Sequence, residues 1–193
     1  MKMKDADVRK LLLDDLIKEY GHDPATCIIN ELGIDFGASR IDVAVVNGIM
    51  HGYEIKSESD NLSRLPRQVK YYNKLFERMT IVTCSKYLDD VLEIIPTWWG
   101  VSVVSQKKDR LISKRKGRLT SSQDKHFLLK LLWKKDLENL VDHLGLPKKT
   151  KKMRKNKLIS LFMEEADLSI IRPFVYSVLK ERKSDSYNSL IVN

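Results

Sequence analysis

The chain has 193 residues, of which 42% are hydrophobic and 32% are charged. This balance predicts one ordinary domain or two small ones and excludes a wholly disordered chain. No apolar run reaches about 18 residues, and charges interrupt the first 20 residues, so we expect neither a membrane span nor a signal peptide. Two cysteines, Cys27 and Cys84, are too few for a disulfide framework. We therefore expect a cytoplasmic protein with buried free thiols.

Positive charge is concentrated in the second half of the chain. Residues 1–105 contain 13 Lys and Arg against 16 Asp and Glu, a net charge of −3. Residues 106–193 contain 22 Lys and Arg against 10 Asp and Glu, a net charge of +12. This asymmetry favours a polyanion partner for the second half, and nucleic acid is the commonest one. The alternative is a basic surface that is only solvated.

The first half alternates helical and strand patterns. Apolar residues near helical spacing predict a first helix that ends at Gly21. The turn signal Asn47-Gly48 predicts an antiparallel hairpin between the strand patterns on either side. The chain order is then strands at 26–32, 40–47 and 50–57, a helix at 65–78, a strand at 79–84, a helix at 86–95 and a strand at 100–105. This order predicts an α/β domain over residues 1–105.

The second half reads as helical. Residues 106–119 form a basic connector, either a loose linker or an edge hairpin. Apolar residues at helical spacing then predict a small all-α domain over 120–183, with a capping box at 120–123 and Trp133 in its core. Residues 184–193 are expected to form a flexible tail.

Three acidic residues lie inside or at the end of predicted strands, at Glu31, Asp42 and Glu54. A buried carboxylate is costly unless a cation or hydrogen bonds accompany it. Glu54 and Lys56 are two positions apart and so share one face of a strand, and Asp42 lies on the other strand of the hairpin. Carboxylate oxygens are the ligands that Mg²⁺ prefers, and a nearby lysine can position water or stabilise developing charge. These residues are candidates for a phosphodiester-hydrolysing site.

The pattern of Asp42 followed by Glu54-Ile55-Lys56 on consecutive strands resembles the PD-(D/E)xK nuclease superfamily. Gln68 and Tyr72 resemble the Q-x-x-x-Y helix of its RecB-like branch. The segments 40–42, 54–58 and 64–68 also resemble those of small nuclease-like proteins of bacteria and mobile elements. The resemblance covers about residues 5–105 and implies a restriction-endonuclease-like mixed central sheet flanked by helices. One departure is Ile41 before Asp42, where the family pattern has proline.

The resemblance implies a role for each residue of this set. Glu31, Asp42 and Glu54, with the carbonyl of Ile55, would hold one or two Mg²⁺ or Mn²⁺ ions. Lys56 would orient the attacking water, and the Gln68 and Tyr72 pair would steady the site or contact the nucleic-acid backbone.

Structural alternatives exist for the same residues. Asp42 could be paired with Arg40, Glu54 and Lys56 could form an exposed ion pair, and Glu31 could simply close a strand. Gln68 and Tyr72 could belong to a solvated helix surface.

Residues 135–165 read as a helix, a basic loop and a second helix. This arrangement loosely resembles SAP-like nucleic-acid-binding modules. Its basic residues are expected to contact phosphates, namely Lys148, Lys149, Lys151, Lys152, Arg154, Lys155 and Lys157. In the first half of the chain, Arg64 is a further candidate for a phosphate contact.

The sequence therefore favours a Mg²⁺- or Mn²⁺-dependent nuclease, a phosphodiester hydrolase for which DNA is a better-supported substrate than RNA. A nuclease-fold protein that binds nucleic acid or regulates without cutting is the first alternative, and a protein-interaction factor is the second. The sequence leaves open whether the chain forms a homodimer, and it predicts no membrane partner.

Overall fold

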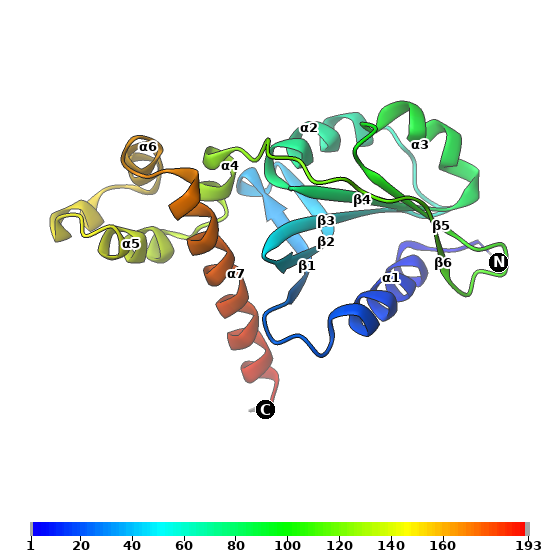
Figure 1. Cartoon of the computed structure of the whole chain (residues 1–193), viewed down its shortest axis with the longest axis horizontal. Helices are drawn as coiled ribbons and strands as arrows, with labels where there is room; N and C mark the ends of the chain where they lie inside the picture. Colours follow the sequence, from blue (N-terminus) through cyan, green and yellow to red (C-terminus); the bar gives the residue numbers. More distant parts are fainter. Residues whose placement is uncertain (1, 192–193) are drawn as a thin grey trace.

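A computed structural model describes the backbone of residues 2–191 and the side chains of residues 2–182. Its centre is a six-stranded sheet in the order β1-β2-β3-β4-β5-β6 (Figure 1). Strands β1 to β3 are antiparallel, β4 and β5 run parallel to β3, and β6 is antiparallel to β5. The sheet is therefore mixed, as predicted. Its strands are β1 (Cys27–Ile34), β2 (Ser39–Asn47), β3 (Ile49–Lys56), β4 (Arg78–Thr83), β5 (Gly100–Val104) and β6 (Leu111–Arg115).

Helices cover both faces of the sheet, which confirms the α/β class. Helix α1 (Asp5–Tyr20) packs on one face, and helices α2 (Leu65–Leu75) and α3 (Leu88–Ile94) pack on the other (Figure 1). Successive side chains of β2 point to opposite faces of the sheet. Val45 therefore packs in the cluster with α1, and Val46 packs in the cluster with α2. Each face thus has its own apolar core.

The C-terminal helices join the α2 side of the sheet. They are α4 (Lys125–Lys130), α5 (Lys134–His143), α6 (Lys155–Glu165) and α7 (Leu168–Ile191), with the 3-10 turn η3 (Lys148–Lys152) between α5 and α6. Their apolar residues belong to the same core cluster as those of α2 and of β1. A buried polar contact adds to this packing, since the Tyr176 hydroxyl donates to Glu77 Oε2 at 2.5 Å. The helices predicted as a C-terminal domain thus share one core with the sheet.

Several local predictions differ from the structure. The connector contains β6, so of its two readings the edge hairpin is the correct one. Helix α4 is capped by Asp124, which accepts from the amides of the first turn, and not by residues 120–123. Helix α7 continues to Ile191, with no glycine or proline after Pro173, so the backbone of residues 184–191 in the predicted tail is helical. Residues 192 and 193 of the predicted tail lie outside the described residues.

Two further predictions concern the cysteines and membranes. Cys27 and Cys84 are buried, as expected, and neither is part of a disulfide in the described structure. None of the helices within residues 2–191 combines the length and the apolar character that crossing a bilayer demands.

Candidate functional site

The three acidic residues singled out in the sequence occupy neighbouring positions across three adjacent strands. The register of β1 and β2 places Glu31 opposite Asp42. The β2–β3 ladder stops at the pair of Val43 and Tyr53, so Asp42 and Glu54 are the next positions along their strands. The hairpin register therefore brings together, in one row, carboxylates that are up to 23 residues apart in the sequence.

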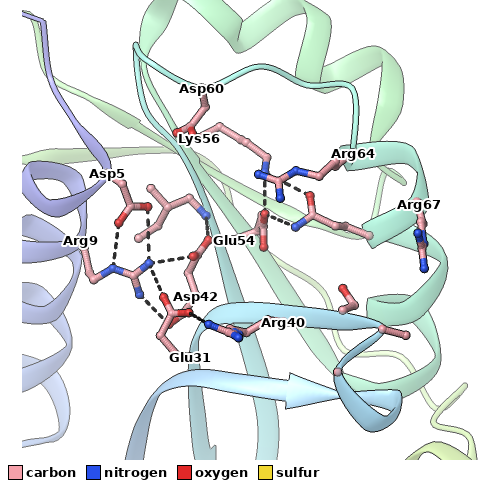
Figure 2. A pocket seen from close by; sticks show the side chains of 15 residues that line it. Asp5, Arg9, Glu31, Arg40, Asp42, Glu54, Lys56, Asp60, Arg64 and Arg67 are labelled. Atoms are coloured by element: carbon pink, nitrogen blue, oxygen red, sulfur yellow. Dashed lines mark hydrogen bonds and ion pairs between the residues drawn. The ribbon is translucent and has the colours of Figure 1, made fainter.

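Strands β2 and β3 separate at Asp42, and a polar pocket opens where they part. Asp42 Oδ2 accepts a hydrogen bond of 2.7 Å from the amide of Ile55, in place of a ladder hydrogen bond. The pocket has a volume of about 640 Å³ (Figure 2). Seven of the predicted site residues line it, namely Glu31, Asp42, Glu54, Ile55, Lys56, Arg64 and Gln68.

Glu54 lies at the base of this pocket and is only 2% exposed. Its Oε1 accepts from Lys56 Nζ at 2.6 Å and from Gln68 Nε2 at 2.7 Å, and its Oε2 lies 2.8 Å from the Tyr72 hydroxyl. Gln68 Oε1 accepts from Lys56 Nζ at 3.1 Å, so the amide holds both members of the ion pair. Gln68 and Tyr72 can both reach Glu54 because they are four residues apart on α2 and so lie on one face of the helix.

Burial controls the proton affinity of these groups. Desolvation, together with the negative charge of Asp42, raises the pKa of Glu54 to about 7. Burial also raises the pKa of Asp42, although the Ile55 amide and Arg9 oppose that effect. Burial and the neighbouring Glu54 raise the pKa of Tyr72 well above its usual value, so its hydroxyl keeps its proton. Strongly perturbed carboxylates in a pocket are typical of functional sites.

Arg9 of α1 is the most connected cation of the pocket, and the sequence analysis missed it. Its Nη2 lies 2.8 Å from Asp42 Oδ1 and 2.9 Å from Glu31 Oε1, and its Nε lies 3.0 Å from Asp5 Oδ1 (Figure 2). Its Nη1 donates to the Asp42 carbonyl oxygen at 2.8 Å. The guanidinium therefore joins the first helix to two of the three strand carboxylates. Its only trace in the sequence is the spacing of Asp5 and Arg9, four residues apart.

Glu31 differs from the other two carboxylates in its backbone. Its φ of 58° lies in the left-handed region, which costs a residue with a side chain about 1 kcal/mol or more. Its side chain is 46% exposed and also pairs with Arg40, with 3.2 Å between Nη1 and Oε2. Strain of this kind is frequent at functional sites.

These contacts decide between the interpretations that the sequence left open. Asp42 pairs with Arg9 and not with Arg40. Glu54, Lys56 and Tyr72 are buried, which excludes an exposed ion pair and a solvated helix face.

The donor set of the pocket suits a hard cation, because Glu31, Asp42 and Glu54 offer carboxylate oxygens. Within the described part of the chain, no three His, Cys, Asp or Glu side chains already converge as a ligand set. Arg9 and Lys56 lie against these carboxylates instead. A divalent cation would therefore have to replace part of the Arg9 contacts.

The predicted basic residues of the second half lie apart from the base of the pocket. Lys148, Lys149, Lys151 and Lys152 belong to η3, Arg154 precedes α6, and Lys155 and Lys157 lie in its first turn. Figure 1 shows the connection between α5 and α6 at the end of the molecule remote from α3. Lys155 is the member of this set that reaches the sheet side, where its Nζ lies 4.6 Å from the ring centre of Phe36.

Trp133 is 63% exposed, so its predicted place in the core of the C-terminal helices is wrong. The predicted helical stripe is interrupted after α4, and Trp133 is the N-cap residue of α5. Its ring is therefore free to face outward, where Arg182 Cζ lies 4.0 Å from the ring centre.

Comparison with known proteins finds a matching family, a similar phage protein and a solved structure with a partly similar fold. The family model described as "Bacteriophage P4 protein cII" matches residues 1–193. The chain is similar to "Protein cII" of Enterobacteria phage P4, with 29% identity over 191 residues that cover 98% of this chain and 71% of that protein. The fold is also similar to a solved structure of a protein of unknown function from Silicibacter pomeroyi, with 16% identity and a TM-score of 0.40 over 60% of this chain and 75% of the other.

Proposed function

We propose that this chain, which belongs to the bacteriophage P4 protein cII family, is a metal-dependent nuclease that hydrolyses phosphodiester bonds, with DNA as its preferred substrate. The observation that carries the proposal is the buried pair of Glu54 and Lys56 beneath Asp42 in a polar pocket. A buried ion pair is expensive to maintain and adds little to stability, so its retention needs another reason. Chemistry on a phosphate supplies that reason.

The charge of the pocket fits a phosphate substrate. Arg9, Arg40, Arg64 and Arg67 all line it, together with the carboxylates that would bind a cation. Arg67 lies on α2 away from Asp42 and Glu54, whereas the Arg64 side chain extends from the start of α2 toward Lys56 and Glu54 in this view (Figure 2). Arginines in this position can donate two hydrogen bonds to one phosphate and hold the backbone over the pocket.

Each residue of the pocket would have a separate role in hydrolysis. Glu31, Asp42 and Glu54, with the Ile55 carbonyl, would hold Mg²⁺ or Mn²⁺, which when bound polarises the phosphate and favours ionisation of the attacking water. The Lys56 ammonium would orient that water and stabilise the negative charge that develops on the phosphate. Gln68 fixes the position of Lys56 Nζ, and Tyr72 fixes Glu54.

A second function deserves a test because Arg9 neutralises Asp42 and Glu31 without any metal. In that case the chain binds nucleic acid and regulates without cutting. The basic residues around η3 serve either function, since lysines and arginines bind phosphates irrespective of sequence.

The test incubates the full chain with plasmid DNA, single-stranded DNA and RNA in Mg²⁺, in Mn²⁺ and in EDTA. We expect metal-dependent cleavage that falls at least about a hundredfold in Asp42→Asn, Glu54→Gln and Lys56→Met. Glu58→Gln is the matched control, because this nearby acid pairs with Lys108 outside the pocket. Intact substrates with both metals, or equal cleavage by the wild type and Asp42→Asn, would contradict the nuclease proposal. A gel shift without cleavage would then favour the regulatory function.

A further inference from the structure

A second hollow, of about 580 Å³, adjoins the polar pocket and shares Glu31 and Gly37 with it. Among the described side chains, the exposed large hydrophobic ones include two aromatics, Phe36 at 58% and Trp133 at 63% exposure. Both line this hollow, although they come from the β1–β2 connection and from the start of α5. Two aromatic rings left in water in one hollow indicate a ligand with flat apolar faces.

Cations accompany both rings. Lys130 and Lys155 place their Nζ atoms 5.6 and 4.6 Å from the Phe36 ring centre, and Arg182 Cζ lies 4.0 Å from that of Trp133. All three cations also line the hollow. The ligand that this surface fits therefore combines flat rings with negative charge.

Two of these three cations pair with a carboxylate, and within the described residues the third does not. Lys130 Nζ pairs with Asp35 at 2.6 Å, and Arg182 pairs with Asp136. Among the side chains that the structure describes, Lys155 has no carboxylate within ion-pair distance. Burial and the nearby Arg182 lower the pKa of Lys155, so an anion placed beside it would relieve an unfavourable environment.

The backbone holds Phe36 outward. Asp35 and Phe36 have φ values of 50° and 56°, consecutive left-handed residues that are not glycine. This conformation is strained. The ion pair of Asp35 with Lys130 stabilises the turn and links it to α4. The Phe36 ring that this turn carries is left 58% exposed.

We propose that this hollow binds unpaired nucleotides, with bases stacked on Phe36 and Trp133 and phosphates beside Lys155, Lys130 and Arg182. Base stacking on aromatic rings combined with a cationic groove is how proteins bind single strands without sequence preference. Bases inside an intact duplex are already stacked on one another and cannot cover these rings. The hollow therefore selects a single strand or a frayed end.

The position of the hollow extends this inference to the substrate of the proposed nuclease. Because the two hollows meet at Glu31 and Gly37, a strand held on the rings would continue into the polar pocket. That continuation rests on the proposed function, whereas the binding of unpaired nucleotides does not.

The test measures binding of a fluorescent oligothymidylate of about 16 nucleotides, near the upper end of known site sizes, by the full chain in EDTA. We expect Phe36→Ala and Trp133→Ala each to weaken binding about tenfold or more, which is what the loss of one stacked base gives. A blunt-ended duplex, which has no unpaired loop, should bind the wild type and both variants alike. Leu119→Ala is the matched control, because Leu119 is also 58% exposed but lies outside the hollow.

Trp133 supplies a second, direct readout. Its fluorescence should be quenched by oligothymidylate, and the quenching should disappear in Trp133→Phe, because Trp99 is buried and the half-buried Trp98 lies outside the hollow. Thermal unfolding of each variant checks that it is folded.

The outcomes separate the two proposals. Wild-type affinity in both aromatic variants, equal loss of duplex and single-strand binding, or a dimer that dissociates in Trp133→Ala would overturn the stacking site. If the wild type does not cleave but Phe36→Ala loses single-strand binding, the stacking site stands and the nuclease proposal fails. If Phe36→Ala and Trp133→Ala bind single strands and cleave DNA as the wild type does, the nuclease proposal stands and the stacking site fails.

Discussion

Replacing Arg9 by methionine keeps the helix and the apolar stem of the side chain but removes the guanidinium that faces Asp5, Glu31 and Asp42. The Asp42 pair dominates, because the two side chains are only 18% and 20% exposed. Breaking a fully buried pair costs about 3–5 kcal/mol, and an exposed one contributes at most about 1 kcal/mol. Partial exposure therefore predicts a loss of about 2–3 kcal/mol. For a chain of this size, that is a fall in Tm of roughly 4–12 °C.

A divalent cation should reverse most of this loss. An ion that binds only the folded protein adds about 2.7 kcal/mol at a hundred times its Kd, close to the stability that Arg9→Met removes. In the wild type the ion must displace Arg9, so the gain in Tm with Mn²⁺ should be smaller than in the variant. Thermal unfolding in Mn²⁺ and in EDTA measures both gains.

Arg115→Met is the control for this experiment. Arg115 donates to the carbonyl oxygens of Trp99 at 2.7 Å and of Pro96 at 3.3 Å, so its loss also destabilises the fold but exposes no acidic cluster. Mn²⁺ should not restore its Tm. If Mn²⁺ raises the Tm of Arg9→Met no more than that of Arg115→Met, the carboxylates do not share a cation.

Three further predictions follow from the buried titratable groups. Glu54 must lose its proton to bind a cation and its pKa is raised to about 7, so Mn²⁺ affinity measured by calorimetry should rise up to about tenfold per pH unit below pH 7 and level off above it; an affinity independent of pH would refute this. Lys56→Met should lower the cleavage rate about a hundredfold while single-strand binding in EDTA stays within about twofold; a proportional loss of both would indicate a structural role instead. Burial lowers the pKa of His51 to about 3 from its ordinary 6.5, so the unfolded chain binds a proton that the folded protein excludes, and stability should fall as pH drops below 6.5. Urea titrations should show up to about 3 kcal/mol of this loss by pH 4, and the slope should be shallower in His51→Gln.

The sheet and most of the polar pocket were predictable because their signals are local. Strand alternation, the Asn47-Gly48 turn and the spacing of Glu54 and Lys56 each depend on neighbouring residues. The turn fixes the hairpin register, and the register brings Asp42 next to Glu54. Gln68 and Tyr72 were singled out by their resemblance to the Q-x-x-x-Y helix of RecB-like nucleases, a pattern that places both residues on one helix face.

The residues that were missed meet the site only through tertiary packing. Arg9 reaches Asp42 across 33 positions, and nothing in the local pattern of the first helix indicates that contact. Trp133 was assigned to the core because it lies between apolar residues at helical spacing. The break between α4 and α5 turns it outward beside Arg182, which no periodic pattern reveals.

Crystals soaked with Mn²⁺ and measured at the manganese absorption edge test most directly whether this pocket holds a catalytic cation. We predict an anomalous density peak between the carboxylates of Asp42 and Glu54, with the Arg9 guanidinium moved away from Asp42. The same soak of Asp42→Asn should give no peak there. An empty pocket in the wild type at a Mn²⁺ concentration that supports cleavage, or a peak bound elsewhere on the chain, would contradict the proposed metal site.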